Sequence, residues 1–175
     1  MNLFRTLLLA LLALGAAGCA SVNVDDYRNE KPALDLAQYF NGTIDGWGMF
    51  QDRSGKVLKR FRVRIDATWI DNTGTLDEHF EFADGTRERR VWTLVKNGDT
   101  YTGTAGDVVG TARGHASGNA LRWNYVLALP VDGTTWNMDM DDWMYLLDDK
   151  TMLNRTAMSK LGVDVGQITL SFSKR

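Results

Sequence analysis

The stretch Val57–Ile70, VLKRFRVRIDATWI, decides the fold class of this chain. Every second residue is apolar, in the series Phe61, Val63, Ile65, Ala67 and Trp69. The residues between them are polar, in the series Arg60, Arg62, Arg64, Asp66 and Thr68. Alternation with a period of two is typical of a β-strand that has one buried face and one solvated face. We therefore expect a strand in an antiparallel sheet.

The same pattern continues on both sides of this strand. Residues 75–82 follow a turn at 71–74 and place apolar Leu76, Phe80 and Phe82 on one face. The pairs Asp84-Gly85, Asn97-Gly98 and Asp132-Gly133 are hairpin signals. Pro130 is expected to end the strand before the last of these turns. Further strands are expected at 42–51, 87–96, 101–105, 110–116, 121–129, 136–147, 152–158 and 167–172.

The spacing of these strands predicts the architecture. About nine or ten short strands with regular turn signals indicate a sandwich or a barrel. Consecutive hairpins favour an up-and-down barrel, because closure removes exposed strand edges. We predict that residues 34–175 form one all-β domain, an antiparallel up-and-down barrel of lipocalin-like (calycin-like) type. The arginines on the polar face argue against a barrel embedded in lipid.

The N-terminus has a different composition from the rest of the chain. Arg5 and the terminal amine precede an apolar run, Leu7–Ala17, and small residues then lead to Cys19. This order is typical of a signal peptide, and the run is too short to span a bilayer permanently. Cys19 is the sole cysteine, which excludes a disulfide within the chain and a site with several cysteine ligands.

Residues 16–19, Ala-Ala-Gly-Cys, resemble the bacterial lipobox, although that pattern prefers Leu where this chain has Ala16. The resemblance implies that 1–18 are removed as a lipoprotein signal peptide and that Cys19 carries the lipid, including acyl chains such as palmitate. Ala20 in place of Asp implies a Gram-negative outer membrane, with the domain facing the periplasm. An ordinary signal peptide is the alternative. Residues 19–33 are predicted to be a flexible tether, and 35–40 a helical turn or an extended entry to the barrel.

Several segments resemble DUF3833, a family of bacterial lipoproteins with no assigned activity. They extend over nearly the whole mature chain and therefore make the match specific. The resemblance implies a lipoprotein and transfers no mechanism or catalytic residue. The segments are Tyr39–Gly42 (YFNG), Trp47–Arg53 (WGMFQDR), Arg90–Trp92 (RVW), Gly118–Trp123 (GNALRW), Asp141–Tyr145 (DDWMY), Asn154-Arg155 and Met158–Lys160 (MSK).

Aromatic and methionine side chains indicate a site inside the barrel. Six Trp and seven Met residues would line an apolar pocket or simply fill the core, since small barrels do either. If their strands pair, Asp142 and Arg155 are expected to form a partly buried ion pair. The candidate ligand-binding residues are Trp92, Trp123, Tyr125, Asp142, Trp143, Asn154 and Arg155.

Other functional classes have little support in the sequence. A net charge of −2 argues against nucleic-acid binding. The only histidines, His79 and His115, belong to no H-E-x-x-H motif, and no P-loop, dinucleotide fingerprint or G-x-S-x-G elbow is present. The arginine row 60–64 is expected to pair with Asp77 and Glu81. No cofactor or metal site is predicted. We expect an envelope protein that binds a small apolar or lipid-like ligand; the alternative is a structural or interaction module with a filled barrel, and an enzyme is a weaker hypothesis.

Overall fold

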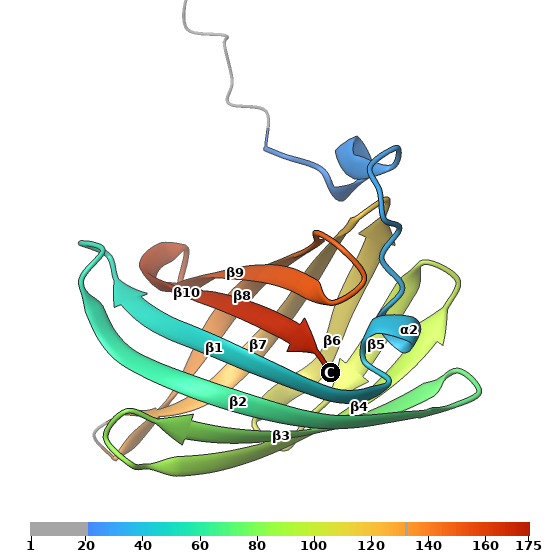
Figure 1. Ribbon diagram of the computed structural model, residues 1–175. Helices are drawn as coiled ribbons and strands as arrows, with labels where there is room; N and C mark the ends of the chain where they lie inside the picture. Colours follow the sequence, from blue (N-terminus) through green and yellow to red (C-terminus); the bar gives the residue numbers. More distant parts are fainter. Residues whose placement is uncertain (1–20, 132) are drawn as a thin grey trace, which may run out of the picture.

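The computed structural model describes residues 21–131 and 133–175. Cys19 and the expected signal peptide, 1–18, lie outside the described residues, as does Asp132 of the predicted hairpin turn. Within the described residues, ten antiparallel strands close into one barrel (Figure 1). Each strand pairs with its sequence neighbours, and β1 (Gly42–Asp52) also pairs with β10 (Val163–Lys174). The predicted up-and-down barrel is confirmed.

The strand bounds differ from the predicted ones by a few residues, mostly because the strands are longer than the sequence pattern showed. The remaining strands are β2 (Val57–Ile70), β3 (Thr73–Phe82), β4 (Arg87–Asn97), β5 (Thr100–Thr104), β6 (Val108–Ser117), β7 (Ala120–Val131), β8 (Thr134–Leu146) and β9 (Thr151–Lys160).

Pro130 does not end its strand, contrary to the prediction, because β7 continues to Val131. Pro130 pairs with Thr135 of β8, whereas the ladder between β7 and β6 reaches no further than Leu127. A proline lacks the N–H that a central strand must donate. It is tolerated here because the strand has become an edge on its β6 side.

The alternation in β2 decides which side chains enter the barrel. Val63, Ile65 and Ala67 are buried, and the arginines between them face solvent. Two glycines of β1 make room for this inner layer. A Cβ at Gly48 would collide with the ring of Phe61, and one at Gly46 would lie 2.7 Å from Val63. These two glycines therefore allow bulky side chains of β2 to cover β1.

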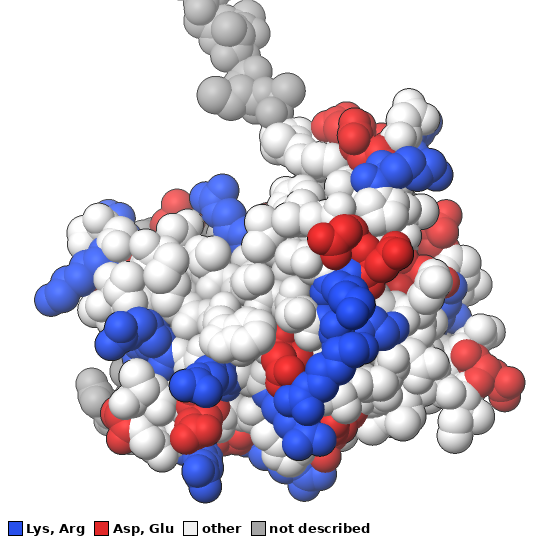
Figure 2. Space-filling view, in the orientation of Figure 1, with Lys and Arg blue, Asp and Glu red and all other residues white. Residues whose placement is uncertain are grey.

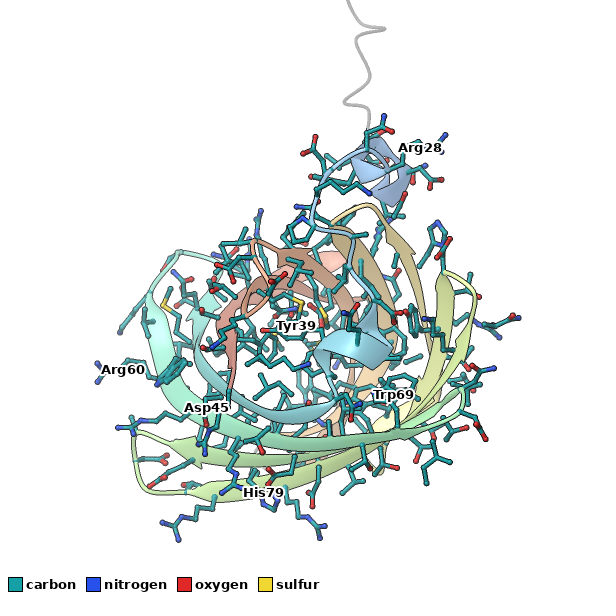
Figure 3. The ribbon with its side chains drawn as sticks, turned by 45° about the vertical axis from the view of Figure 1, so that its right-hand side comes forward. Arg28, Tyr39, Asp45, Arg60, Trp69 and His79 are labelled. Atoms are coloured by element: carbon teal, nitrogen blue, oxygen red, sulfur yellow. The ribbon has the colours of Figure 1, made fainter. Side chains whose placement is uncertain are left out.

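The short helix α2 (Leu36–Tyr39) closes one end of the barrel. Leu36, Tyr39 and Phe40 are buried, and the indole N–H of Trp69 donates to the carbonyl of Phe40 over 2.8 Å. Figure 3 shows Tyr39 within the outline of the barrel at this end, with α2 beside it. We call this the closed end; it carries the β2–β3, β4–β5, β6–β7 and β8–β9 turns. The opposite end, with the β1–β2, β3–β4, β5–β6, β7–β8 and β9–β10 turns, is the mouth.

The N-terminal segment folds against the outside of the barrel near the closed end. The 3-10 helix η2 (Val24–Tyr27) begins with a capping box at Asn23, and Val24 is buried. The ring of Tyr27 packs edge-on to Tyr145 at 5.5 Å, and the N–H of Leu34 donates to Gly118. The described part of the expected tether, 21–33, therefore lies against the barrel wall, because its few apolar residues find partners there. No helix in the described ranges is both long enough and apolar enough to cross a bilayer.

Candidate functional site

The mouth of the barrel opens into a pocket of about 460 Å³. Its lining comes from the inner faces of several strands and is mostly apolar, with three charged side chains. A volume of this size lies within the range of small-molecule sites in proteins. The lining residues are Phe50, Lys59, Phe61, Phe80, Phe82, Glu88, Arg90, Leu127, Leu129, Pro130, Val131, Met158 and Ile168.

A second cavity, of about 120 Å³, lies deeper in the barrel. It shares Phe61, Phe80, Arg90 and Ile168 with the mouth pocket, so the two spaces meet at the same side chains. Residues of α2 and of the adjoining turn, Leu36 and Phe40, line its far side. The two spaces therefore form one largely apolar cavity. It runs from the mouth to α2, which closes the other end of the barrel.

Aromatic side chains form one wall of the inner cavity. Trp92 of β4 packs edge-to-face against Trp123 of β7, with ring centres 5.8 Å apart, and against Tyr125 at 5.5 Å. Trp123 fits because glycines lie opposite it: a Cβ at Gly103 or at Gly114 would collide with its indole. Such perpendicular contacts are favourable between aromatic rings and hold them in place. This wall is therefore a fixed surface.

A polar cluster lies beside the aromatic wall, because Asp142 of β8 pairs with Trp123 of β7. The carboxylate of Asp142 on β8 accepts hydrogen bonds at Oδ1 from the Asn154 amide and, over 3.0 Å, from the Thr156 hydroxyl. All three residues are buried, and Asp142 is only 7% exposed. Asn154 and Thr156 both lie on β9, two residues apart, and the pairing of β8 with β9 sets Asp142 opposite Thr156. The strand register therefore builds this cluster.

A second polar group lies on β3 and β4. The guanidinium of Arg90 holds Asp107 through two nitrogens, with Nη2 2.7 Å and Nε 3.0 Å from its carboxylate oxygens. Its Nη1 lies 3.7 Å from Oε2 of Glu78, whose side chain is 13% exposed. Glu78 faces Arg90 directly across the strand pair. The guanidinium of Arg90 thus lies close to two carboxyl groups, those of Asp107 and Glu78, where the mouth pocket meets the inner cavity.

The buried carboxyl groups of this site have unusual protonation behaviour. Burial, with a contribution from the nearby carboxylates of Asp107 and Asp142, raises the pKa of Glu78 to about 7 against the opposing effect of Arg90. Burial also raises the pKa of Asp142 to about 7, although its hydrogen bonds from Asn154 and Thr156 favour the charged form. Loss of hydration disfavours a charged carboxylate, which is the common cause. Both groups therefore exchange protons near neutral pH.

Five of the seven candidate residues line the inner cavity: Trp92, Trp123, Tyr125, Asp142 and Asn154. The other two do not, because they occupy the alternate face of their strands. Trp143 and Arg155 pair with each other across β8 and β9 on the outside, where the guanidinium of Arg122 covers the Trp143 ring at 5.4 Å. The predicted ion pair between Asp142 and Arg155 is therefore wrong, since the two side chains point to opposite sides of the sheet.

Sequence reasoning missed Glu78, Arg90 and Thr156. A signal was present in the strand parity, because Glu78 lies two residues from both Leu76 and Phe80, and Arg90 lies two residues before Trp92. A charged residue in phase with buried neighbours is a candidate for the interior. Within the described chain, no group of three or more His, Cys, Asp or Glu side chains is arranged to hold a metal ion.

The outer wall carries most of the other charged residues. Asp77 and Glu81 pair with Arg89 and Arg87 of β4, rather than with the arginine row of β2 as expected. Figure 2 shows basic and acidic side chains intermixed on one face of the barrel, and Arg60, Asp45 and His79 project outward in Figure 3. His115 lies 3.3 Å from Asp25 of η2, so it joins the N-terminal segment to the wall. These groups are outside the cavity.

The comparisons with known proteins agree with this geometry. Residues 13–174 match the model of a family described as a protein of unknown function, DUF3833. No curated protein matches the chain.

Two solved structures share the fold. A protein of unknown function from the DUF3598 family of Nostoc punctiforme PCC 73102 aligns with a TM-score of 0.61 and 11% identity, over 83% of this chain and 51% of that protein. The chain therefore spans about half the length of the Nostoc protein. An S-type phycobiliprotein lyase from Guillardia theta aligns with a TM-score of 0.58 and 8% identity, over 80% of this chain and 90% of the lyase. The lyase is a lipocalin-like barrel, so the predicted lipocalin-like fold is confirmed.

Proposed function

Because the chain belongs to the DUF3833 family, for which no activity is described, we propose its function from the barrel itself. The protein binds a small apolar or lipid-like ligand between the mouth pocket and the inner cavity, and it does so as a lipid-anchored protein of the cell envelope. The observation that carries the ligand site is the apolar mouth pocket, which meets a cavity lined by aromatic rings and by buried polar groups.

The shape of the site supports an elongated ligand with one polar end. The inner cavity alone is about as large as a space for a single aromatic ring, since an apolar cavity of about 150 Å³ binds benzene. The mouth pocket is several times larger and lined mainly by Phe, Leu, Val, Met and Ile side chains. A ligand that filled both would place an apolar body in the mouth and a smaller end against Asp142. The related fold of the phycobiliprotein lyase is consistent with a barrel that holds a ligand.

The anchor belongs to the same proposal. Cys19 would carry the lipid, which would hold the protein at the outer membrane with the barrel in the periplasm. Only Ala20 separates Cys19 from Ser21, the first described residue, so at most about 7 Å can lie between them. The segment after Ser21 runs along the wall near the closed end. An anchored protein would therefore keep its mouth at the far end of the barrel from the anchor.

Native mass spectrometry after gentle extraction from membranes tests the ligand site. We expect the protein to carry a bound small molecule, which Leu129→Trp should displace because the larger ring fills the mouth pocket. Ala128→Trp is the matched control, since Ala128 lies on the opposite face of β7. Protein that is empty, and that also takes up no fatty acid, alcohol or phospholipid from a panel, would contradict the proposal. A filled barrel that serves as an interaction module would then be the better account.

Metabolic labelling with a clickable palmitate tests the anchor separately. The wild-type protein should be labelled and recovered with membranes, because acyl chains give durable binding. Cys19→Ala should be unlabelled and released while the barrel stays folded. An unlabelled wild-type protein would contradict lipid attachment without bearing on the ligand site.

A further inference from the structure

The polar wall of the inner cavity limits which ligand end fits there. Glu78, Arg90 and Asp142 line the cavity. Asp107 is not part of the lining, but it binds the guanidinium of Arg90. When these groups are ionised, three negative charges surround one positive charge. An anionic ligand end would therefore enter a site whose charge is already negative.

The guanidinium of Arg90 has little capacity left for a ligand. Nε and Nη2 donate to the carboxylate of Asp107, and Nη1 faces Glu78. Two parallel N–H bonds to one carboxylate are among the strongest polar contacts in proteins. A ligand carboxylate would have to displace Asp107 from this fork, or lie against Glu78 without a counter-charge.

The cavity instead offers unused acceptors. Asp142 receives its hydrogen bonds at Oδ1, and across the described residues none reaches its Oδ2. Glu78 accepts a hydrogen bond from the side chain of Trp92, and its nearest cation, Nη1 of Arg90, is 3.7 Å away. A carboxylate has room for about four donors. Donors from a ligand would satisfy these oxygens, whereas a further acceptor would not.

We propose that the barrel takes an amphiphile by an amine end, with the ammonium between Glu78 and Asp142 and the alkyl chain toward the mouth. This inference rests on the ligand-binding function proposed above. An ammonium supplies three N–H donors and the positive charge that the cavity lacks. The apolar mouth pocket then receives the chain, where Phe61, Phe80 and Ile168 continue from one space into the other.

The protonation behaviour of the site agrees with this assignment. Burial raises the pKa of both Glu78 and Asp142 to about 7. When the site is empty at neutral pH, each group is therefore protonated in a fraction of the molecules. A bound ammonium favours the ionised form of a neighbouring carboxyl group. The groups around Glu78 are Arg90, Asp107, Asp142 and Tyr125, and only Arg90 among these is a cation. Amine binding should therefore strengthen from pH 5.5 to pH 8.

Lys59 at the mouth would favour a ligand that binds in the opposite orientation. It lies over the ring of Phe82, 5.3 Å from the ring centre, and lines the mouth pocket. A fatty acid bound in the opposite direction would place its carboxylate beside Lys59 and its chain toward the inner cavity. The two orientations demand opposite ligand charges, which makes them separable by experiment.

The test compares dodecylamine, dodecanol and dodecanoate for binding to the purified protein by titration calorimetry at pH 8. We expect the amine to bind at least about tenfold more tightly than the carboxylate, with the neutral alcohol between them. Equal or tighter binding of dodecanoate, especially if Lys59→Ala weakens it, would overturn the inference and leave the ligand site standing. Failure of all three ligands to bind would count against both the proposed function and the inference.

Variants at the two carboxyl groups sharpen the test. The double variant E78Q and D142N keeps the side-chain shapes and should remove most of the preference for the amine, while dodecanol binding confirms that the barrel is folded. Glu81→Gln is the matched control on the outer face of β3 and should keep the preference. A preference that survives in the double variant would overturn the inference.

Discussion

At the closed end of the barrel, Phe40 is 3% exposed and the Trp69 indole donates to its carbonyl, whereas at the mouth Trp136 is 41% exposed. The closed end also has polar links: Asp35 caps α2, binds Lys96 over 2.5 Å and accepts from the Tyr101 hydroxyl. The mouth has short turns and an open pocket, whereas α2 covers the closed end.

This difference shows how one regular barrel can combine stability with binding. The ladder of backbone hydrogen bonds runs around both ends, so the strands alone do not distinguish them. The inward side chains do, because those near α2 are almost fully buried, whereas those at the mouth, such as Phe82, are partly exposed. Regions that bind ligands generally have fewer buried contacts than the core. We therefore expect substitutions at the two ends to have different costs.

The largest expected effect lies between the two ends, at Trp123. Trp123→Ala should lower the free energy of unfolding by about 3–5 kcal/mol, because it empties a space that Gly103 and Gly114 leave for the ring. Denaturant unfolding would measure this. A loss well below that range would show that the indole lines a ligand space more than it supports the core.

Truncation of one phenylalanine at each end tests whether the two ends differ in stability. Phe40→Ala at the closed end should cost about 3 kcal/mol, since the side chain is buried against Tyr39 and Phe172. Phe82→Ala at the mouth should cost about 1 kcal/mol or less, because its ring is partly exposed. Equal costs in denaturant unfolding would break the distinction between the two ends.

The next effect concerns pH. The pKa of Glu78 and of Asp142 is raised to about 7 in the folded protein, above the ordinary value for an exposed carboxyl group. The folded state therefore binds more protons than the unfolded state between about pH 4 and pH 7, and these two groups reduce stability as pH rises through that window. The double variant E78Q and D142N should lose this dependence and be more stable than wild type at pH 8, by about 1–3 kcal/mol.

Thermal unfolding at pH 5 and pH 8 would check this difference. The comparison with wild type is needed because surface aspartates such as Asp77, whose pKa is lowered mainly by its hydrogen bond with Arg89, change stability with pH in the opposite direction. A double variant that is less stable than wild type at pH 8 would contradict the account of the inner wall.

The smallest expected effect is on the outer wall. Arg122 binds Asp141 over 2.7 Å and covers the Trp143 ring, but both charged groups are partly solvated. Arg122→Ala should therefore cost less than about 1 kcal/mol, and less still at high salt. A larger cost in unfolding experiments at both low and high salt would mean that packing on Trp143, and not charge, dominates this contact.

The barrel could be predicted from sequence because each strand carries its own period-two pattern and each hairpin its own turn signal. The interior polar site was predicted only in part. Asp142 and Asn154 line the inner cavity, but Arg155 lies on the outer face of β9, because neighbours along a strand point to opposite sides of the sheet. Glu78 and Arg90 become neighbours only through the register of β3 with β4, which composition does not specify.

The N-terminal segment shows a second limit of the sequence. Its polar composition predicted a tether, yet Val24 and Tyr27 find partners on the barrel wall, and Leu34 bonds to Gly118. These contacts depend on the position of the β6–β7 turn. A local pattern cannot encode a partner that lies about 90 residues away, such as His115 for Asp25.

The most direct test of the central claim uses the methionine methyl groups as reporters in an NMR titration with dodecanol. Met144 lines the inner cavity and Met158 the mouth pocket, whereas Met49 lies on the outer face of β1. The Met144 and Met158 resonances should shift together and saturably, while that of Met49 should not move. Shifts confined to Met49, or no shift at any of the three, would contradict a ligand site inside the barrel.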